Sequence, residues 1–409
     1  MREVSGTVTD TEIRVALSGR IDSANFREAE RELSLLTAGR GALPVVLDGK
    51  DLNYISSSGL RVLLRLKKTN PELRFVNVSS EVYEVLDMTG FTQLLKVEKA
   101  FRTVSVEGCE VLGRGAHGTI YRIDRDTVVK VYASGDALSD IRHEREMART
   151  ALVLGIPTAI SYDVVRVGEG YGAVFELLNA RSLSGILASS PGEWDRCVRE
   201  FAALLKKIHA TVAPQGSLPD QRDLVLAWAG TLRDVLPEEE GNRLVSLVEA
   251  VPRDRHLLHG DYHTNNLELQ DGEVLLIDME DLAAGHPIFE LGSIHNTYVG
   301  YSEYDREAIR HFIGIDAEAG KRFWNQMLAA YLGTEDPRRL REVTDKARIV
   351  GYARLLQRAL RHRTPETERG RAEFELWKGE LISLLHRTDT LLFDRTEEAL
   401  PPQGKELPV

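Results

Sequence analysis

One stretch, residues 257–278, restricts the fold and the chemistry of this chain more than any other. It contains the pattern His-x-Asp-x-x-x-x-Asn at His259, Asp261 and Asn266, and a short apolar run then ends at Asp278. Because Mg²⁺ prefers oxygen ligands, we predict that Asn266 and Asp278 bind this ion. Asp261 would accept the proton of an attacking hydroxyl group, and His259 would brace the loop. The stretch therefore predicts a metal-assisted group-transfer site.

A glycine-rich stretch precedes this site in the sequence. Gly113, Gly115 and Gly118 fit the pattern G-x-G-x-x-G-x-V, with Ile120 in the last place. Glycines at these positions let a hairpin backbone approach phosphate oxygens where a Cβ atom would collide. The same glycines also suit an ordinary tight hairpin, so this stretch alone does not establish nucleotide binding.

Lys130 strengthens the nucleotide interpretation, because it lies in the otherwise apolar run from Thr127 to Tyr132. A buried lysine requires an anionic partner, and the phosphates of ATP would supply one. The predicted helix that follows carries Glu144 and Glu146. In kinases a glutamate on this helix pairs with the lysine and holds it against the phosphates. We favour Glu144 as the partner from its distance to the next turn, with Glu146 as the alternative.

The order of these motifs is that of the kinase-like fold. We therefore expect a smaller N-lobe at residues 104–178 and a largely helical C-lobe at residues 179–388. The cofactors would be ATP and Mg²⁺, with the γ-phosphoryl group transferred to a hydroxyl. An isolated His-x-Asp-x-x-x-x-Asn pattern also arises by chance, with Asn265 or Asn266 as a turn residue. The complete set of motifs argues against that alternative.

Two details separate the chain from eukaryotic-type protein kinases. Gly260 stands where those enzymes usually have Arg, and no long activation segment ending in Ala-Pro-Glu follows Asp278. Instead, Ile277–Asp281 and Gly285–Leu291 resemble the motifs I-D-x-x-D and G-x-P-x-x-D-L of the aminoglycoside phosphotransferase and choline-kinase-like family. Glu290 replaces the usual Asp of the second motif.

The resemblance covers residues 108–300 and is looser as far as residue 388. It implies that the backbone at Glu176 and Leu178 meets the adenine of the nucleotide, although these residues also fit a simple buried strand. The family phosphorylates hydroxyl groups of aminoglycosides, choline, homoserine, sugars and related small molecules, and its C-terminal helices build the acceptor site.

Candidates for acceptor contacts are an acidic run and three aromatic residues of the C-terminal part. A run of three Glu residues is more typical of a solvated face, and aromatic residues at helical spacing are more typical of a core. The acceptor and the choice between ATP and GTP stay open at this point. The candidates are Glu238–Glu240, Trp324, Tyr331 and Trp377.

Residues 1–98 are predicted to form a separate small α/β domain. Apolar residues alternate over residues 13–17, as in a strand, and recur at helical spacing over residues 26–36. Five segments resemble, in the same order, the STAS domains of bacterial anti-sigma-factor antagonists, which implies a regulatory or partner-binding role. The segments are Leu17–Asp22, Val46–Asp48, Ile55–Leu60, Leu73–Asn77 and Leu86–Phe91.

The STAS resemblance implies that Ser58 is a possible phosphate acceptor. Many members of that family have Asp two residues earlier, where this chain has Ser56. Alternatively, one of Ser56, Ser57 and Ser58 caps the helix that follows. The two roles are compatible, because a helix N-terminus also stabilises a phosphate.

The expected fold class is thus multidomain, α/β and α+β. A STAS-like regulatory domain at residues 1–98 precedes a bilobal protein-kinase-like domain at residues 104–388. Residues 389–409 combine charges with paired prolines and lack apolar periodicity, which predicts a flexible tail.

The composition excludes several other classes of protein. The net charge of −11, with basic residues interspersed among acidic ones, disfavours a nucleic-acid partner. No apolar run approaches the roughly 20 residues that span a bilayer, so we expect a cytoplasmic protein without a membrane partner. Cys109 and Cys197 have no neighbours at metal-ligand spacing, and we expect both to be packing residues.

Two hypotheses for function remain. The first is a small-molecule kinase with a regulatory STAS-like domain, whose partners are a nucleotide, a hydroxyl-bearing compound and a possible regulatory protein. The second is a signalling kinase that phosphorylates Ser58 of its own chain or a serine of a partner. A non-catalytic scaffold conflicts with the intact set of Lys130, Asp261, Asn266 and Asp278.

Overall fold

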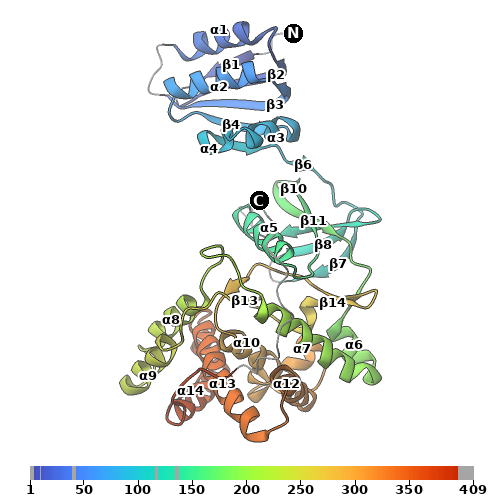
Figure 1. Cartoon of the computed structure of the whole chain (residues 1–409), viewed down its shortest axis with the longest axis vertical. Coiled ribbons are helices and arrows are strands. Elements are labelled where there is room, and N and C mark those ends of the chain that lie inside the picture. Colours follow the sequence, from blue (N-terminus) through green and yellow to red (C-terminus); the bar gives the residue numbers. More distant parts are fainter. Residues whose placement is uncertain (1–3, 10, 39–42, 116–117, 134–137, 395–409) are drawn as a thin grey trace, which may run out of the picture. The chain divides into compact units, whose positions relative to one another are not determined.

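The chain divides into two compact units, residues 1–105 with 164–169 and residues 106–163 with 170–409 (Figure 1). The division falls within strand β10 (Ser161–Val167), and residues 165–166 of this strand pair in parallel with β6 (Arg102–Thr103). The computed structural model describes residues 4–9, 11–38, 43–115, 118–133 and 138–394.

The first unit contains a mixed five-stranded sheet in the order β1-β2-β3-β4-β5. Only β1 runs antiparallel to its neighbour, and parallel neighbours require crossover connections, which the helices supply. The strands are β1 (Val4–Val8), β2 (Ile13–Ile21), β3 (Val45–Ile55), β4 (Arg74–Val78) and β5 (Lys96–Lys99). The helices are α1 (Phe26–Thr37), α2 (Ser57–Thr69), α3 (Ser80–Met88) and α4 (Phe91–Leu94).

The core of this unit follows the predicted periodicities. Ile13, Val15 and Leu17 of β2 are buried and alternate with exposed residues, because successive side chains of a strand point to opposite faces. On α1, Ala29 and Leu33 are one helical turn apart and both are buried. The strand and helix predicted in this region are therefore confirmed.

The second unit begins with antiparallel strands in the order β7-β8-β9-β11. Helix α5 (Leu138–Val153) packs on β11. This sheet carries the glycine-rich stretch at the β7–β8 turn and Lys130 in β9. The strands are β7 (Glu110–Arg114), β8 (Gly118–Arg122), β9 (Thr127–Tyr132) and β11 (Gly170–Glu176).

Two small sheets position the His-x-Asp-x-x-x-x-Asn loop. Strand β13 (Leu257–Leu258), which leads into the loop, pairs with β16 (Ala283–Ala284). The loop ends in the 3-10 helix η2 (Thr264–Asn266), and the hairpin of β14 (Leu267–Gln270) and β15 (Glu273–Leu276) follows. Strand β12 (Arg181–Ser182) pairs with β14.

Helices make up the rest of the second unit. Helix α10 (Ile288–Tyr298) is buried along almost its whole length, and α13 (Pro337–Arg361) packs against it. Trp324 and Trp377 belong to this core, as the packing interpretation predicted. The other helices are α6 (Leu183–Ser189), η1 (Pro191–Glu193), α7 (Trp194–Ala210), α8 (Gln221–Leu232), α9 (Glu238–Glu249), η3 (Gly300–Glu303), α11 (Ala308–Ile313), α12 (Ala317–Leu332), η4 (Thr364–Glu366) and α14 (Glu368–Leu385).

The predicted fold class is confirmed: a mixed α/β domain is followed by a kinase-like fold with a helical C-terminal region. The domain limits at residues 98, 104 and 388 stay predictions. Within the predicted tail, Leu391 and Phe393 are buried in the core of the second unit, and residues 395–409 lie outside the described residues. None of the helices in the described residues is long and apolar enough to cross a membrane.

Candidate active site

The β14–β15 hairpin explains why Asn266 and Asp278 come together across eleven intervening residues. Leu267 and Leu276 pair at the open end of the hairpin, and the Ile277 N–H donates to the Asn266 carbonyl at 3.0 Å. The two predicted metal ligands are thus the residues that flank this end. Asp278 has a positive φ of 62°, which places it in the left-handed region that Asp tolerates better than most residues.

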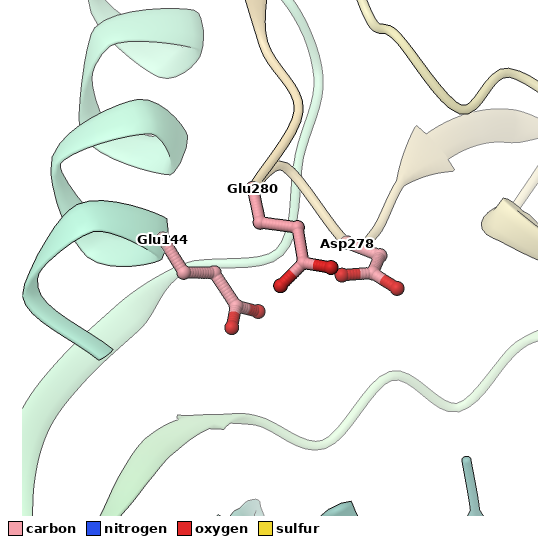
Figure 2. Close-up of side chains that lie close together, drawn as sticks. All are labelled: Glu144, Asp278 and Glu280. Atoms are coloured by element: carbon pink, nitrogen blue, oxygen red, sulfur yellow. The ribbon is translucent and has the colours of Figure 1, made fainter. Parts of the chain in front are cut away.

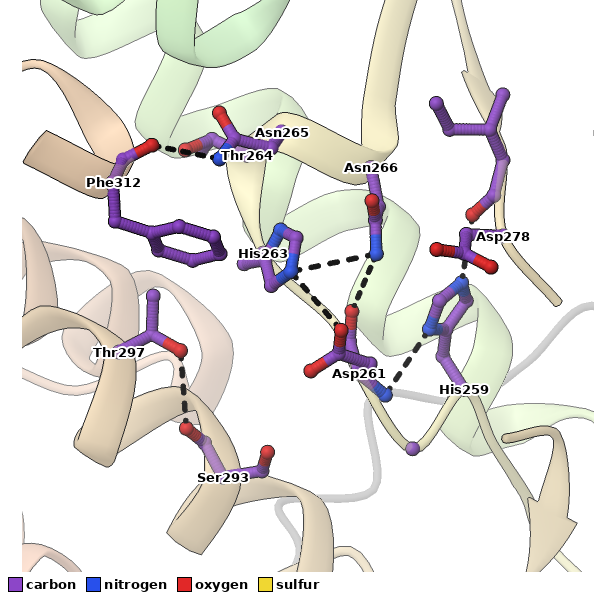
Figure 3. Close-up of polar contacts among 12 residues, drawn as sticks. His259, Asp261, His263, Thr264, Asn265, Asn266, Asp278, Ser293, Thr297 and Phe312 are labelled. Atoms are coloured by element: carbon purple, nitrogen blue, oxygen red, sulfur yellow. Dashed lines mark hydrogen bonds and ion pairs between the residues drawn. The ribbon is translucent and has the colours of Figure 1, made fainter. Parts of the chain in front are cut away.

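His259 braces the loop, as predicted for its geometry. Its ring is fully buried, Nδ1 accepts the Asp261 N–H at 3.3 Å, and Nε2 donates to the Ile277 carbonyl at 3.3 Å (Figure 3). One imidazole therefore joins the backbone of the loop to Ile277, which lies between the end of β15 and Asp278.

The carboxylate of Asp261 is held on one side and open on the other. His263 Nε2 lies 3.1 Å from Asp261 Oδ2, yet the Asp261 side chain remains 41% exposed (Figure 3). Burial raises the pKa of Asp261, but the hydrogen bond and charge of His263 and the charge of Arg354 lower it by more, to about 2. Asp261 is therefore ionised at neutral pH.

Asn266 is oriented by the same loop. Its Nδ2 donates to the Asp261 carbonyl at 3.0 Å, which leaves the amide oxygen Oδ1 for another partner. This oxygen and the Asp278 carboxylate are the kind of donors that Mg²⁺ prefers. The residues present thus fit a Mg²⁺ ion, and both metal-site roles remain predictions.

Lys130 and Glu144 form a buried ion pair between β9 and α5. Lys130 Nζ lies 3.0 Å from both Glu144 carboxylate oxygens and 3.5 Å from Asp278 Oδ1. The Tyr132 hydroxyl also donates to Glu144. Burial lowers the pKa of Lys130, but Glu144 and Asp278 raise it by more, so the amine stays charged. Glu146 is exposed, and the choice between the two glutamates therefore falls on Glu144.

Glu144, Asp278 and Glu280 bring carboxylate oxygens within 4.8 Å of one another (Figure 2). Lys130 already contributes a positive charge to this acidic group. His143 of α5 forms a second contact with this segment, because its Nε2 lies 2.9 Å from the Glu280 carbonyl oxygen. Helix α5 is therefore joined to the segment after Asp278 both by charge and by a hydrogen bond.

The glycine-rich turn is tight, and residues 116–117 at its tip lie outside the described residues. The Gly115 N–H donates to the Gly118 carbonyl at 2.9 Å. A Cβ atom on Gly118 would lie 2.2 Å from the Val131 carbonyl oxygen, whereas one on Gly113 or Gly115 would meet nothing within 4 Å. Close strand packing thus requires glycine at position 118, and the phosphate-binding role of the three glycines stays a prediction.

Glu176 is the last residue of β11, and Leu178 follows two residues later. The Glu176 carboxylate accepts the Ile160 N–H at 2.7 Å, and the Glu176 N–H donates to the Ile160 carbonyl at 3.0 Å. Both its side chain and its backbone N–H are therefore bound to the neighbouring segment. The adenine contact of the backbone at Glu176 and Leu178 stays a prediction.

A buried network that the sequence pattern did not identify supports the catalytic loop. The Gly260 N–H donates to Glu290 Oε1 at 2.7 Å, and His209 Nε2 donates to Glu290 Oε2 at 2.7 Å. His209 Nδ1 lies 2.8 Å from the Tyr331 hydroxyl, so this acceptor-site candidate is part of the network. The G-x-P-x-x-E-L motif pointed to Glu290 but not to its partners.

The acidic run Glu238–Glu240, another acceptor candidate, lies in the first turn of α9. Glu238 and Glu239 are exposed in the first turn of α9, and Glu240 pairs with His386 at 3.0 Å. The acidic run thus fits a solvated face.

The ring of Phe312, which the sequence reasoning missed, lies 4.9 Å from the His263 ring and is half exposed (Figure 3).

In the first unit, the helix α2 is capped by Ser56. Its hydroxyl oxygen accepts the N–H groups of Ser58 and Gly59 at 3.2 and 3.4 Å. Ser57 is exposed and Ser58 is half-buried. The capping alternative is therefore correct for Ser56, and phosphorylation of Ser58 stays a prediction.

The sequence matches two families. Residues 108–343 match the phosphotransferase enzyme family, abbreviated APH, and residues 4–105 match the STAS domain. A protein of Bordetella bronchiseptica described as an anti-sigma factor antagonist, BtrV, is 38% identical over 85 residues, which cover 20% of this chain and 72% of that protein.

Several solved structures resemble this chain at low sequence identity. A choline/ethanolamine kinase family protein from Mesorhizobium loti is 16% identical with a TM-score of 0.45, covering 68% of this chain and 87% of its own. The ternary complex of APH(2'')-IIa with streptomycin and ATP is 15% identical with a TM-score of 0.46, covering 75% of this chain and 98% of its own.

Proposed function

Because the chain belongs to the phosphotransferase enzyme family and carries an N-terminal STAS domain, we propose that it transfers the γ-phosphoryl group of ATP to a hydroxyl group of a small molecule. The observation that carries this proposal is the ion pair of Lys130 with Glu144, which also reaches Asp278. It joins β9, α5 and the segment after β15 at one point, and kinases need the corresponding Lys–Glu pair and Asp in place for phosphoryl transfer.

Each charged residue has a distinct role in this proposal. Lys130 binds phosphate oxygens. Glu144 holds the Lys130 amine in place, and the Tyr132 hydroxyl in turn donates to Glu144. Asn266 Oδ1 and the Asp278 carboxylate would hold Mg²⁺, which would neutralise negative charge on the phosphates. The Gly113–Gly118 turn would cover the phosphates, and the backbone at Glu176 and Leu178 would contact the adenine.

Asp261 orients the acceptor hydroxyl and receives its proton. With a pKa of about 2, this carboxylate is a weak base. It therefore accepts a hydrogen bond from the hydroxyl before the transfer. It takes the proton as the new bond from the hydroxyl oxygen to the γ-phosphorus forms and the bond from this phosphorus to the oxygen of the leaving ADP breaks. The exposed side of Asp261 is where the acceptor would bind.

The proposal is tested by a screen of hydroxyl compounds for ATP consumption with Mg²⁺ present. Glu144→Gln is expected to reduce turnover about tenfold or more, because Lys130 loses its ionic partner. Glu146→Gln, an exposed change two residues away, is the matched control and is expected to stay within twofold of the unmodified protein. Equal turnover in both variants would contradict the assignment of Glu144, and no turnover with any compound would contradict the small-molecule reaction.

One observation favours the second candidate function, a signalling kinase. Since Ser56 caps α2, the neighbouring Ser58 is not needed for that purpose and lies at the helix N-terminus, which stabilises a phosphate. The full chain would be incubated with γ-labelled ATP and mapped by mass spectrometry. Label on Ser58 that disappears in Asp261→Asn would support this candidate, and label absent from the STAS domain would contradict it.

A further inference from the structure

Arg354 reaches the catalytic loop from helix α13, outside the residues 108–343 that match the phosphotransferase family. One guanidinium nitrogen, Nη1, donates to the Gly260 carbonyl at 3.0 Å and to the Ser293 hydroxyl. The other, Nη2, lies 3.9 Å from Asp261 Oδ1. The side chain is 27% exposed, so these interactions are partly shielded from water.

Close packing of two helices fixes where Arg354 lies. A Cβ atom on Gly292 of α10 would lie 2.9 Å from the Ala347 carbonyl and the Gly351 N–H of α13, and one on Gly351 would lie 2.9 Å from the Gly292 carbonyl. The helices thus meet backbone to backbone at this point. Arg354 follows one turn after Gly351, and Ser293 follows Gly292 directly, so the contact between them is set by the crossing.

The loop itself cannot supply this cation at position 260. Gly260 has a φ of +87°, and a Cβ atom there would lie 2.3 Å from the Asp281 carbonyl oxygen. Any side chain at this position would therefore be strained and would collide with the segment after Asp278. The guanidinium that lies near Asp261 comes from α13.

We propose that Arg354 is a positioning residue for the Asp261 carboxylate in the phosphoryl-transfer reaction. His263 holds Oδ2 at 3.1 Å, while Arg354 faces Oδ1 and fixes the backbone carbonyl of the preceding residue. Each oxygen of the carboxylate thus has a nitrogen partner nearby, His263 at Oδ2 and Arg354 at Oδ1. This inference rests on the proposed function, since it concerns the orientation of the same catalytic group.

Arg354→Met keeps most of the volume of the side chain but removes all its donors. We expect it to lower the rate of Mg²⁺-dependent phosphate release from ATP, with water as acceptor, at least tenfold, while the Kd for ATP changes less than twofold. The rate of Arg354→Lys should fall between the rates of Arg354→Met and the unmodified protein. Arg358→Met, an exposed change one turn further on α13, is the matched control and should keep the full rate.

The positioning role is separated from a purely structural one by chemical rescue. Added guanidinium ion at low millimolar concentration should restore part of the rate in Arg354→Ala but not in Asp261→Asn. The inference is wrong if Arg354→Met releases phosphate at a rate within twofold of that of the unmodified protein. It is also wrong if guanidinium restores no activity in Arg354→Ala and Arg354→Lys is as slow as Arg354→Met. If the unmodified protein releases no phosphate to water, the same variants are compared with a hydroxyl compound that the screen identifies as acceptor. Transfer to neither water nor any screened compound contradicts the proposed function, whereas transfer that Arg354→Met leaves unchanged contradicts this inference alone.

Discussion

The close contact between Gly260 and Asp281 predicts a large effect of Gly260→Ala on the second unit. With φ at +87°, an alanine costs about 1–2 kcal/mol relative to glycine from backbone strain alone. Its Cβ atom would also lie 2.3 Å from the Asp281 carbonyl oxygen and 2.6 Å from the Asp281 Cβ, and relieving such overpacking costs about 1–3 kcal/mol more. We expect a total loss of about 2–5 kcal/mol in the free energy of unfolding.

Gly272→Ala supplies a matched control for the strain term. Gly272 has a φ of +89°, but an added Cβ atom would meet nothing within 4 Å. It should therefore show only the backbone strain of about 1–2 kcal/mol. Urea unfolding followed by tryptophan fluorescence measures both variants, because all four tryptophans, Trp194, Trp228, Trp324 and Trp377, lie in the second unit. Equal losses in the two variants would refute the reasoning from the close contact.

Three further predictions concern other parts of the chain. Ser56→Ala should destabilise α2 by about 1 kcal/mol, seen as faster hydrogen exchange in this helix, whereas Ser57→Ala at the exposed neighbour should change little, and equal exchange in both would contradict the capping role. Lys130→Met removes the cation that pairs with the Glu144 carboxylate, whose side chain is only 4% exposed. Urea unfolding should therefore show a loss of about 3 kcal/mol in the free energy of unfolding, and a loss under about 1 kcal/mol would contradict the pairing. Burial, with a smaller effect of a nearby arginine, lowers the pKa of His295 to about 3. The unfolded chain therefore takes up a proton below about pH 6.5 that the folded chain refuses, and stability is lost as the pH falls from there towards 3. His295→Gln should remove about 2 kcal/mol of the stability difference between pH 7 and pH 5. His362→Gln, a change at an exposed position, should leave that difference unchanged. An unchanged difference in His295→Gln would contradict the reasoning.

The sequence predicted the parts of the site that rest on short-range geometry. Asn266 and Asp278 come together because a tight hairpin joins them, and Lys130 meets Glu144 because a strand and the next helix pack directly. Spacing along the chain carries this information. The choice between Glu144 and Glu146 needed the burial of one and the exposure of the other, which surrounding charges in the sequence did not reveal.

Contacts between distant segments could not be read from spacing. Arg354 lies 93 residues after Asp261, and the sequence contains many arginines with nothing that marks this one. Its place depends on the crossing of α10 and α13, which becomes visible only when both helices are packed. His209 is a similar case, because its hydrogen bond to Glu290 joins residues 81 positions apart.

The central claim is that Asp261 serves a phosphotransferase site that uses ATP. The most direct measurement is the rate at which the purified chain, with Mg²⁺, moves label from γ-labelled ATP to any acceptor, compared with Asp261→Asn. This variant keeps the shape of the side chain but removes its charge. The account predicts transfer by the unmodified chain and a rate at least about 100-fold lower in Asp261→Asn, with ATP still bound by both proteins. Transfer at the same rate by both proteins, or no transfer by either, would contradict it.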